Sequence, residues 1–330
     1  MKRKLKVLFY GVTHEHASGK LNTLRALKDD YEVVAVVDDR PRRSPRFVDP
    51  AWPIRLDDMN VIPESEAWSL SDVDVGFVET TNRDLMEIAG RFAARGVPMH
   101  CDKPCGEAAE PYRTILESCR AKNLPFQIGY MYRGNPALKW IWGFVREGEL
   151  GDVRFIEADM NHDYQADGYP EYISTFRGGI LYNLGCHLVD AVYPIVKGGL
   201  VSAIPMIGDA AGDPPGSRTS CKAYLRFEDT DVLLRTSSRM GGGNLVRRLR
   251  VDGTKGTVDL CPIERFDGQE LTLKLTVGGR EEVRRFGVQT DRYADRLADL
   301  AAIVRGEKAN DQDYDRDLAV HELTLKACGL

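Results

Sequence analysis

The sequence lacks the features that mark several classes of protein. Its 330 residues contain no apolar run of the roughly 18–20 residues that a membrane-spanning helix needs. The apolar stretch after the basic first residues ends at Gly11, too early for the apolar segment of a secretion signal. A net charge of −5, with acidic and basic residues interleaved, offers no extended positive surface to a nucleic acid. We therefore expect a cytoplasmic protein with neither a membrane nor a nucleic acid as partner.

Cysteine is present, but it is not arranged for disulfides or for zinc. The seven cysteines are scattered and none forms a C-x-x-C pair, which is typical of reduced and mostly buried thiols. His14, His16 and His187 could be considered as metal ligands, but we expect them on separate elements, and no Cys/His spacing matches a zinc site. The sequence predicts no metal centre.

Length and pattern indicate two domains of different architecture. A chain of 330 residues exceeds the roughly 250–300 at which a single core stops growing. Up to residue 130, short β-branched runs alternate with helix-length segments, which is typical of a doubly wound parallel sheet of the Rossmann type. We expect strands at 5–10, 32–37, 74–78, 97–101 and 125–129, and helices at 17–27, 85–95 and 110–122.

From residue 131 to 330 the strands no longer alternate with helices. Apolar and polar residues alternate over 271–277, as in a strand with one buried face. We expect an α/β domain with a large, open, mostly antiparallel sheet, and C-terminal helices that pack back toward the first domain. Its strands are predicted at 153–160, 220–227, 231–237, 249–252 and 271–277, and its helices at 137–147, 292–305 and 316–328.

The turn after the first strand carries an incomplete dinucleotide motif. Gly11 follows a strand and precedes a helix, as the first glycine of G-x-G-x-x-G does, but Thr13 and His16 replace the later glycines. Taken alone, this signal is weak. Asp38 ends the second strand, where an acid can accept hydrogen bonds from the ribose hydroxyls of a dinucleotide, or can be a solvated turn residue.

Two further segments carry groups suited to proton transfer. Lys103 follows the fourth strand and precedes a proline, which favours an extended backbone, so its ammonium either points at a substrate or lies in a surface loop. In a helix that opens near Leu181, Asn183 and His187 are four residues apart and share a face. A histidine titrates near neutral pH, so His187 either transfers a proton or is satisfied by a nearby carbonyl.

In combination, these motifs resemble those of the Gfo/Idh/MocA oxidoreductases. Asp102-Lys103-Pro104 is similar to their E-K-P motif, and residues 178–190 are similar to their G-G…D-x-G-x-H-x-x-D motif. Residues 127–136 and 146–151 resemble their passage between domains, and residues 80–82 resemble their T-P-N loop. The resemblance runs from Val7 to the C-terminal helices and so covers nearly the whole chain, and three ordered motifs at the right separations make it specific.

The resemblance implies a Rossmann domain, a second domain with an open sheet, and a substrate cleft between them. It implies a nicotinamide cofactor, a sugar, cyclitol or other polyol as substrate, and a homodimer or homotetramer. We expect NAD, with NADP possible, because Asp38 would repel a 2′-phosphate. Lys103 and His187 are implied as catalytic, with Asn183 assisting. The implied cofactor contacts are Gly11, Thr13, His14, Asp38, Thr80, Asn82, Asp102 and Lys103. The implied substrate contacts are Lys103, Tyr130, Arg133, His162, Asn183 and His187.

Departures from the family pattern keep other functions open. Thr13 and His16 replace glycines, Leu85 stands where a histidine often follows T-P-N, and Asn183 replaces an aspartate. The alternatives are an enzyme that retains NAD and oxidises a sugar hydroxyl only transiently, and a nucleotide-binding sensor with impaired catalysis. The presence of both Lys103 and His187 favours an enzyme. We further expect the pairs at 247–248 and 284–285 to be exposed arginines.

Overall fold

The computed structural model describes residues 2–41, 53–164 and 168–330. The chain divides into two compact units, one of Met1–Tyr130 with Tyr293–His321, the other of Met131–Arg292 with Glu322–Leu330. Among the described helices, none combines the length and the apolar character that a membrane crossing requires.

A six-stranded parallel sheet forms the centre of the first unit. Its strand order, β3-β2-β1-β4-β5-β6, reverses direction between β1 and β4, the point where doubly wound sheets bind their ligands. The predicted parallel sheet is confirmed. The strands are β1 (Leu5–Tyr10), β2 (Tyr31–Val37), β3 (Val61–Ile62), β4 (Val75–Val78), β5 (Met99–Cys101) and β6 (Phe126–Ile128).

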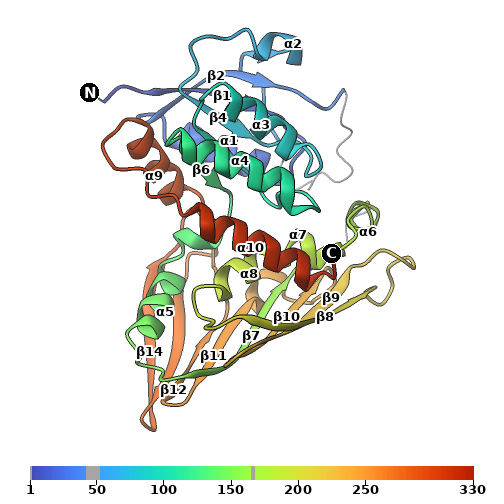
Figure 1. Cartoon of the computed structure of the whole chain (residues 1–330), viewed down its shortest axis with the longest axis vertical. Coiled ribbons are helices and arrows are strands. Elements are labelled where there is room, and N and C mark those ends of the chain that lie inside the picture. The colour runs from blue at the N-terminus through green and yellow to red at the C-terminus, as the bar shows by residue number, and fades with distance from the viewer. Residues whose placement is uncertain (1, 42–52, 165–167) are drawn as a thin grey trace. The chain divides into compact units, whose positions relative to one another are not determined.

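Helices cover this sheet because its strands are apolar on both faces. Every residue of β4 is buried, as expected of a central parallel strand. Helices α3 and α4 lie side by side (Figure 1), and Leu297 and Leu300 of α9 belong to the core that β1 forms. The helices of this unit are α1 (Ala17–Ala26), α2 (Glu64–Ala67), α3 (Leu85–Ala94), α4 (Ala109–Ala121) and α9 (Ala294–Val304). Helix α10 (Tyr314–Ala327) begins in this unit and ends in the second.

The second unit is built on an eight-stranded sheet with the order β14-β13-β12-β11-β7-β10-β9-β8. All neighbouring strands are antiparallel except β7 and β10, so the prediction of a mostly antiparallel sheet is confirmed. The strands are β7 (Val153–Asn161), β8 (Leu200–Gly208), β9 (Ser220–Phe227), β10 (Asp231–Ser237), β11 (Arg248–Gly253), β12 (Gly256–Leu260), β13 (Glu270–Val277) and β14 (Arg280–Val288). The edge strands β8 and β14 were not predicted.

Helices lie on one face of the second sheet (Figure 1). Helices α7 (Gly179–Asn183) and α8 (Gly185–Val192) contact β7, β9 and β10, where alternate residues of β7 are fully buried. The opposite face carries ion pairs, among them Arg235–Asp159 at 2.8 Å. The remaining helices are α5 (Pro136–Arg146) and α6 (Tyr169–Ile173), with 3₁₀ turns at η1 (Met131–Gly134) and η2 (Gly243–Val246).

Helix α5 begins where its sequence predicts. The Asn135 side chain accepts hydrogen bonds from the backbone N–H groups of Ala137 and Leu138 at 2.9 and 3.1 Å, and Pro136 occupies the first turn, where no N–H is needed. The Asn135 amide also donates to the Ile263 carbonyl at 2.7 Å. This cap therefore ties the start of the second unit to the segment that follows β12.

Candidate functional site

The turn after β1 requires glycine. Gly11 has a φ of +92°, and a Cβ on it would lie 2.6 Å from the Thr80 backbone nitrogen. Backbone hydrogen bonds continue past the strand ends, because the Glu79 N–H donates to Tyr10 and the His14 N–H donates to Glu79. The turn is thus packed directly against the end of β4, at the point where the strand order reverses.

A buried aspartate that sequence analysis missed fixes this turn. Asp39 accepts hydrogen bonds from the Val12 N–H at 2.8 Å, the Thr13 hydroxyl at 2.7 Å and the Thr80 hydroxyl at 2.6 Å. Thr13 and Thr80, which were predicted to contact the cofactor, donate their hydroxyl protons to Asp39. The only sequence signal was a second aspartate directly after Asp38.

Asp38, the predicted ribose ligand, lies after the end of β2 and is partly exposed. Its carboxylate accepts two hydrogen bonds from Arg40, at 2.8 Å from Nε and 2.5 Å from Nη2. Hydrogen bonding to Arg40 lowers the pKa of Asp38, so the group is ionised at neutral pH. Arg42 and Arg43, which could also influence a nearby phosphate, lie outside the described residues.

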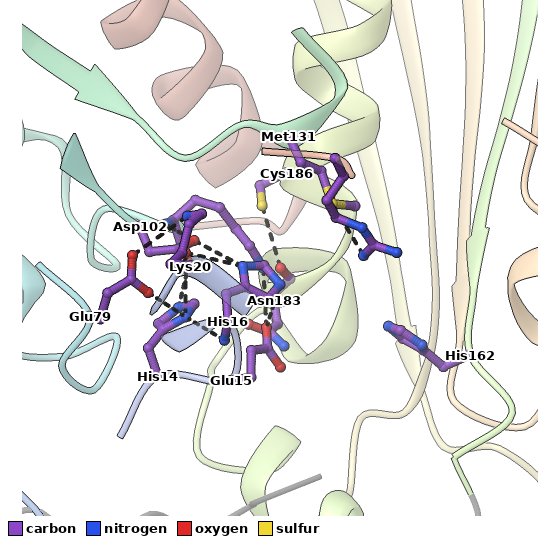
Figure 2. A network of polar contacts seen from close by, with 12 residues as sticks. His14, Glu15, His16, Lys20, Glu79, Asp102, Met131, His162, Asn183 and Cys186 are labelled. Atoms are coloured by element: carbon purple, nitrogen blue, oxygen red, sulfur yellow. Dashed lines mark hydrogen bonds and ion pairs between the residues drawn. The ribbon is translucent and has the colours of Figure 1, made fainter. Parts of the chain in front are cut away.

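Asp102 follows β5 and is fully buried at the centre of a polar cluster (Figure 2). It accepts hydrogen bonds from the Lys20 ammonium at 2.7 Å and from the Lys103 N–H at 2.7 Å, and it lies 3.1 Å from Nδ1 of His16. Burial alone would raise the pKa of Asp102, but the neighbouring His14 and Lys20 hold it well below its ordinary value. Asp102 is therefore a buried anion with cationic and hydrogen-bonding partners.

Lys20 is the buried cation of this cluster. Besides Asp102, its ammonium lies 2.7 Å from Nε2 of His100, 3.5 Å from the Glu79 carboxylate and 4.6 Å from the ring centre of Tyr293. Burial raises the pKa of Glu79 well above its ordinary value, which favours the neutral acid there. Sequence analysis missed Lys20, although its spacing from Ala17 and Leu24 places it on the buried face of α1.

His14 and His16 lie together at Asp102, and not on the separate elements that we expected. Each of the three residues offers one potential metal-ligand atom, and these atoms lie within 4.8 Å of one another. Hydrogen bonds already engage both nitrogens of His14, since Nδ1 accepts from the His16 N–H and Nε2 lies 3.0 Å from the Lys103 carbonyl. The Lys20 ammonium beside Asp102 further disfavours a cation, so the absence of a metal stays our prediction.

Lys103, the candidate catalytic lysine, is buried in the loop after β5. Its ammonium lies 3.1 Å from the carboxylate of Glu15, in the turn after β1. Burial would raise the pKa of Glu15, but Lys103 and the two histidines outweigh it and lower the pKa, so the pair is ionic. Glu15 was not singled out from the sequence, because an acid in a loop expected to hold pyrophosphate has no obvious role.

Asn183 and the candidate histidine, His187, lie on two consecutive short helices of the second unit, α7 and α8. The helix begins at Gly179, earlier than predicted, and is interrupted at Leu184 between α7 and α8. Asn183 and His187 are fully buried, and the His187 ring centre lies 5.6 Å from that of Tyr132. Because of this interruption, Asn183 and His187 do not lie on one regular helix, as the sequence had predicted.

Arg133, a predicted substrate ligand, forms a buried ion pair within the second unit. Its Nε and Nη2 donate to the carboxylate of Asp190 at 2.9 and 2.7 Å. The last acid of the predicted motif therefore binds this arginine. Tyr130, which ends the first stretch of the chain, is also buried, as is Asn82 after β4.

The structure contradicts the prediction for Arg247. It was expected to be exposed, but it is 1% exposed, because its guanidinium is paired with the buried carboxylate of Glu264 and bonded to the Asn161 carbonyl. Its Nη2 lies 3.1 Å from Nδ1 of His162, whose ring stacks on Tyr164 at 4.1 Å between ring centres. The predicted substrate ligand His162 is thus held by a buried arginine and an aromatic ring.

The predicted residues therefore gather in two groups, one in each unit. Those at the ends of β1, β4 and β5 lie close together in the first unit, with Asp38 at the end of β2. The predicted contacts that the second unit holds are Arg133, His162, Asn183 and His187.

Comparisons with known proteins agree with the fold and the motifs. A family model described as the GFO/IDH/MocA C-terminal domain matches residues 141–259. The rhizopine catabolism protein MocA of Rhizobium meliloti is 31% identical over 122 residues, which are 36% of this chain and 37% of that protein. Inositol 2-dehydrogenase of Rhizobium meliloti (strain 1021) is 26% identical over 195 residues, 57% of each chain. The matches thus span less than two thirds of these relatives.

A solved structure extends the likeness in fold to nearly the whole chain. A 3-ketoreductase from Actinomadura kijaniata, crystallised with NADP and TDP-benzene, has a TM-score of 0.78 at 16% identity, covering 98% of this chain and 96% of that one. The family model, the relatives and the shared fold lead to one conclusion: the chain is similar to the Gfo/Idh/MocA oxidoreductases, and residues 141–259 match the C-terminal domain of that family.

Proposed function

We propose that this chain is an NAD(P)-dependent dehydrogenase or reductase whose substrate is a sugar, cyclitol or related polyol. The observation that carries the proposal is the position of Lys103, a buried ammonium directly after β5 of a parallel sheet whose order reverses between β1 and β4. The relatives support it, since one is an inositol 2-dehydrogenase and a structural neighbour is a ketoreductase with bound NADP.

The first unit has the features to hold the cofactor. Gly11 supplies the tight turn, the ten-residue helix α1 presents its N-terminus behind that turn, and Asp38 offers a carboxylate after β2. The nicotinamide, when bound, accepts or supplies the hydride. The Lys103 ammonium then donates a hydrogen bond to the substrate oxygen and stabilises negative charge that develops there. His187 accepts the hydroxyl proton during oxidation, with Asn183 assisting, and returns it during reduction.

We propose NAD as the preferred cofactor. An ionised Asp38 repels the 2′-phosphate of NADP but accepts hydrogen bonds from a free ribose diol. Arg40, which is bonded to Asp38, is the residue that could reverse this preference. Calorimetry with both cofactors tests the assignment, and tighter binding of NADP would contradict it.

We propose that the chain forms a homodimer or homotetramer through the face of the second sheet opposite α7 and α8. Ile204 and Met206 of β8 are 54% and 45% exposed on the face that also carries the ion pairs Arg235–Asp159 and Arg248–Asp259, which a second copy could meet. Light scattering at micromolar concentration should give a dimer or larger, and a monomer would refute this part of the proposal.

The experiment that tests the activity is a screen with net turnover as its readout. The protein is incubated with NAD or NADP and with a panel of sugars and cyclitols, and the absorbance of reduced nicotinamide is followed. Net reduction identifies a dehydrogenase. Substrate conversion with the cofactor unchanged identifies an enzyme that retains NAD, whereas cofactor binding without any conversion identifies a sensor.

A further inference from the structure

Three consecutive residues of the turn after β1 contact the Asp102-Lys103 segment. Nε2 of His14 lies 3.0 Å from the Lys103 carbonyl, the Glu15 carboxylate lies 3.1 Å from the Lys103 ammonium, and Nδ1 of His16 lies 3.1 Å from the Asp102 carboxylate. Figure 2 shows His14 and His16 beside Asp102. One turn therefore contacts the backbone and the side chain of the candidate catalytic lysine, as well as the side chain of the residue before it.

The N–H groups of the same turn are directed into the protein. Those of Val12, His14 and His16 donate to the Asp39 carboxylate, the Glu79 carbonyl and the His14 ring. In a glycine-rich dinucleotide loop such groups approach the pyrophosphate. Here His14, Glu15 and His16 make the turn a support for the loop after β5.

We infer that Glu15 is a positioning residue for Lys103, held in place by His14 and His16. The inference rests on the proposed function, in which the Lys103 ammonium acts on the substrate. A buried ammonium needs a counter-charge, and a lysine side chain loses considerable entropy when it is held in a single geometry. Glu15 supplies the charge and fixes the direction of the ammonium. Because Glu15 is anionic and lies in the turn expected to face the pyrophosphate, it also weakens cofactor binding.

These two roles predict changes of opposite sign in one variant. Glu15→Gln keeps the size of the side chain and removes its charge. The kcat should fall by about 10–100-fold, the scale of a misplaced catalytic group. The Kd for NAD, measured by calorimetry, should fall by about 2–10-fold as the repulsion is removed. Glu117→Gln, on the exposed face of α4, is the matched control and should change neither quantity.

A purely structural role for Glu15 would give a different result. Destabilisation of the turn would weaken NAD binding and lower kcat together, and that outcome would overturn the inference, as would an unchanged kcat. Glu15→Asp, which keeps the charge on a shorter side chain, should recover part of the lost kcat.

A second measurement does not depend on turnover. In lysine-labelled protein, the Lys103 side-chain NMR signal is assigned by its loss in Lys103→Met. It should shift in Glu15→Gln and stay in place in Glu117→Gln, and an unshifted signal would overturn the pairing. If the signal shifts but wild-type protein converts no substrate, the proposed function fails while the pairing of Glu15 with Lys103 stands.

Discussion

The two candidate proton-transfer groups have very different surroundings. Lys103 lies in a buried cluster in which ammonium groups, carboxylates and histidines are in direct contact. His187 lies beside the uncharged ring of Tyr132, and the acid on its own helix, Asp190, is bonded to Arg133. The first group is surrounded by charges, whereas the second lies against an uncharged aromatic ring.

Because of this difference, we expect substitutions around Lys103 to change stability and substitutions around His187 to change catalysis. A buried charge that loses its partner costs several kcal/mol, so the cluster around Asp102 couples stability to ionisation. Around His187, a substitution should alter the chemistry of the imidazole with less effect on folding.

Removal of the imidazole should have the largest effect on rate. His187→Ala is expected to lower kcat by about 10²–10⁴-fold, the usual contribution of a positioned general base. The Kd for NAD should stay within about threefold of wild type, because the histidine is proposed to act on the substrate oxygen. Steady-state kinetics and calorimetry measure the two quantities. A kcat within a few-fold of wild type would make His187 a structural helix residue.

Removal of the buried lysine should have the largest effect on stability. Lys20→Met keeps the length of the side chain but leaves Asp102 buried without its ammonium partner, which should cost about 3–5 kcal/mol of unfolding free energy. Urea denaturation at pH 7 measures the change. Lys28→Met, just beyond the same helix at an exposed position, should stay within about 0.5 kcal/mol. Equal losses in the two variants would contradict a buried charge network.

The sequence could predict the scaffold but not this network. Apolar runs separated by helices predict the parallel sheet, and Lys103 could be found because it follows a buried strand and precedes a proline. Lys20 is hidden in an ordinary helical stripe, and the roles of Glu79 and His100 depend on which strand ends lie side by side. The tertiary structure sets which strand ends lie side by side, and the periodicity of the sequence does not reveal it.

Charge explains why one edge strand of the second unit, β14, was missed. Strand β14 has the sequence Arg-Glu-Glu-Val-Arg-Arg-Phe-Gly-Val, which shows no apolar alternation because an edge strand is half solvated and is protected by charge. Arg247 was wrongly predicted to be exposed, because its buried partner Glu264 lies 17 residues further along the chain. Neither a charged edge strand nor a distant counter-charge leaves a local signal.

Acid should weaken the cluster around Asp102 within a defined pH range. Burial, reinforced by Lys103 and opposed by Asp102, lowers the pKa of His16 from 6.5 to about 4, so the unfolded chain binds a proton that the folded protein excludes. The unfolding free energy should therefore be greatest above pH 6.5 and should fall as the pH decreases toward 4, by up to about 3 kcal/mol. Urea titrations between these pH values test this, and His16→Gln should flatten the dependence. A slope equal to that of wild type in His16→Gln would contradict the assignment.

The smallest predicted effect comes from a variant that gives His187 a charged neighbour, as Lys103 already has. Asn183→Asp places a carboxylate near His187, where Asp190 cannot serve because Arg133 binds it in a two-pronged ion pair. A carboxylate stabilises the imidazolium, so the histidine should hold its proton to higher pH, and the acidic limb of the pH–rate profile should move upward by about one unit. Asn183→Ser removes the amide without adding charge and should leave the limb in place. An acidic limb that does not move in Asn183→Asp has two explanations. Either His187 is not the titrating base, which the kinetics of His187→Ala decide. Or the interruption at Leu184 has turned residue 183 away from the imidazole ring. The crystal structure of the variant distinguishes these two explanations, because the second requires the new carboxylate to lie beyond hydrogen-bond distance of the imidazole.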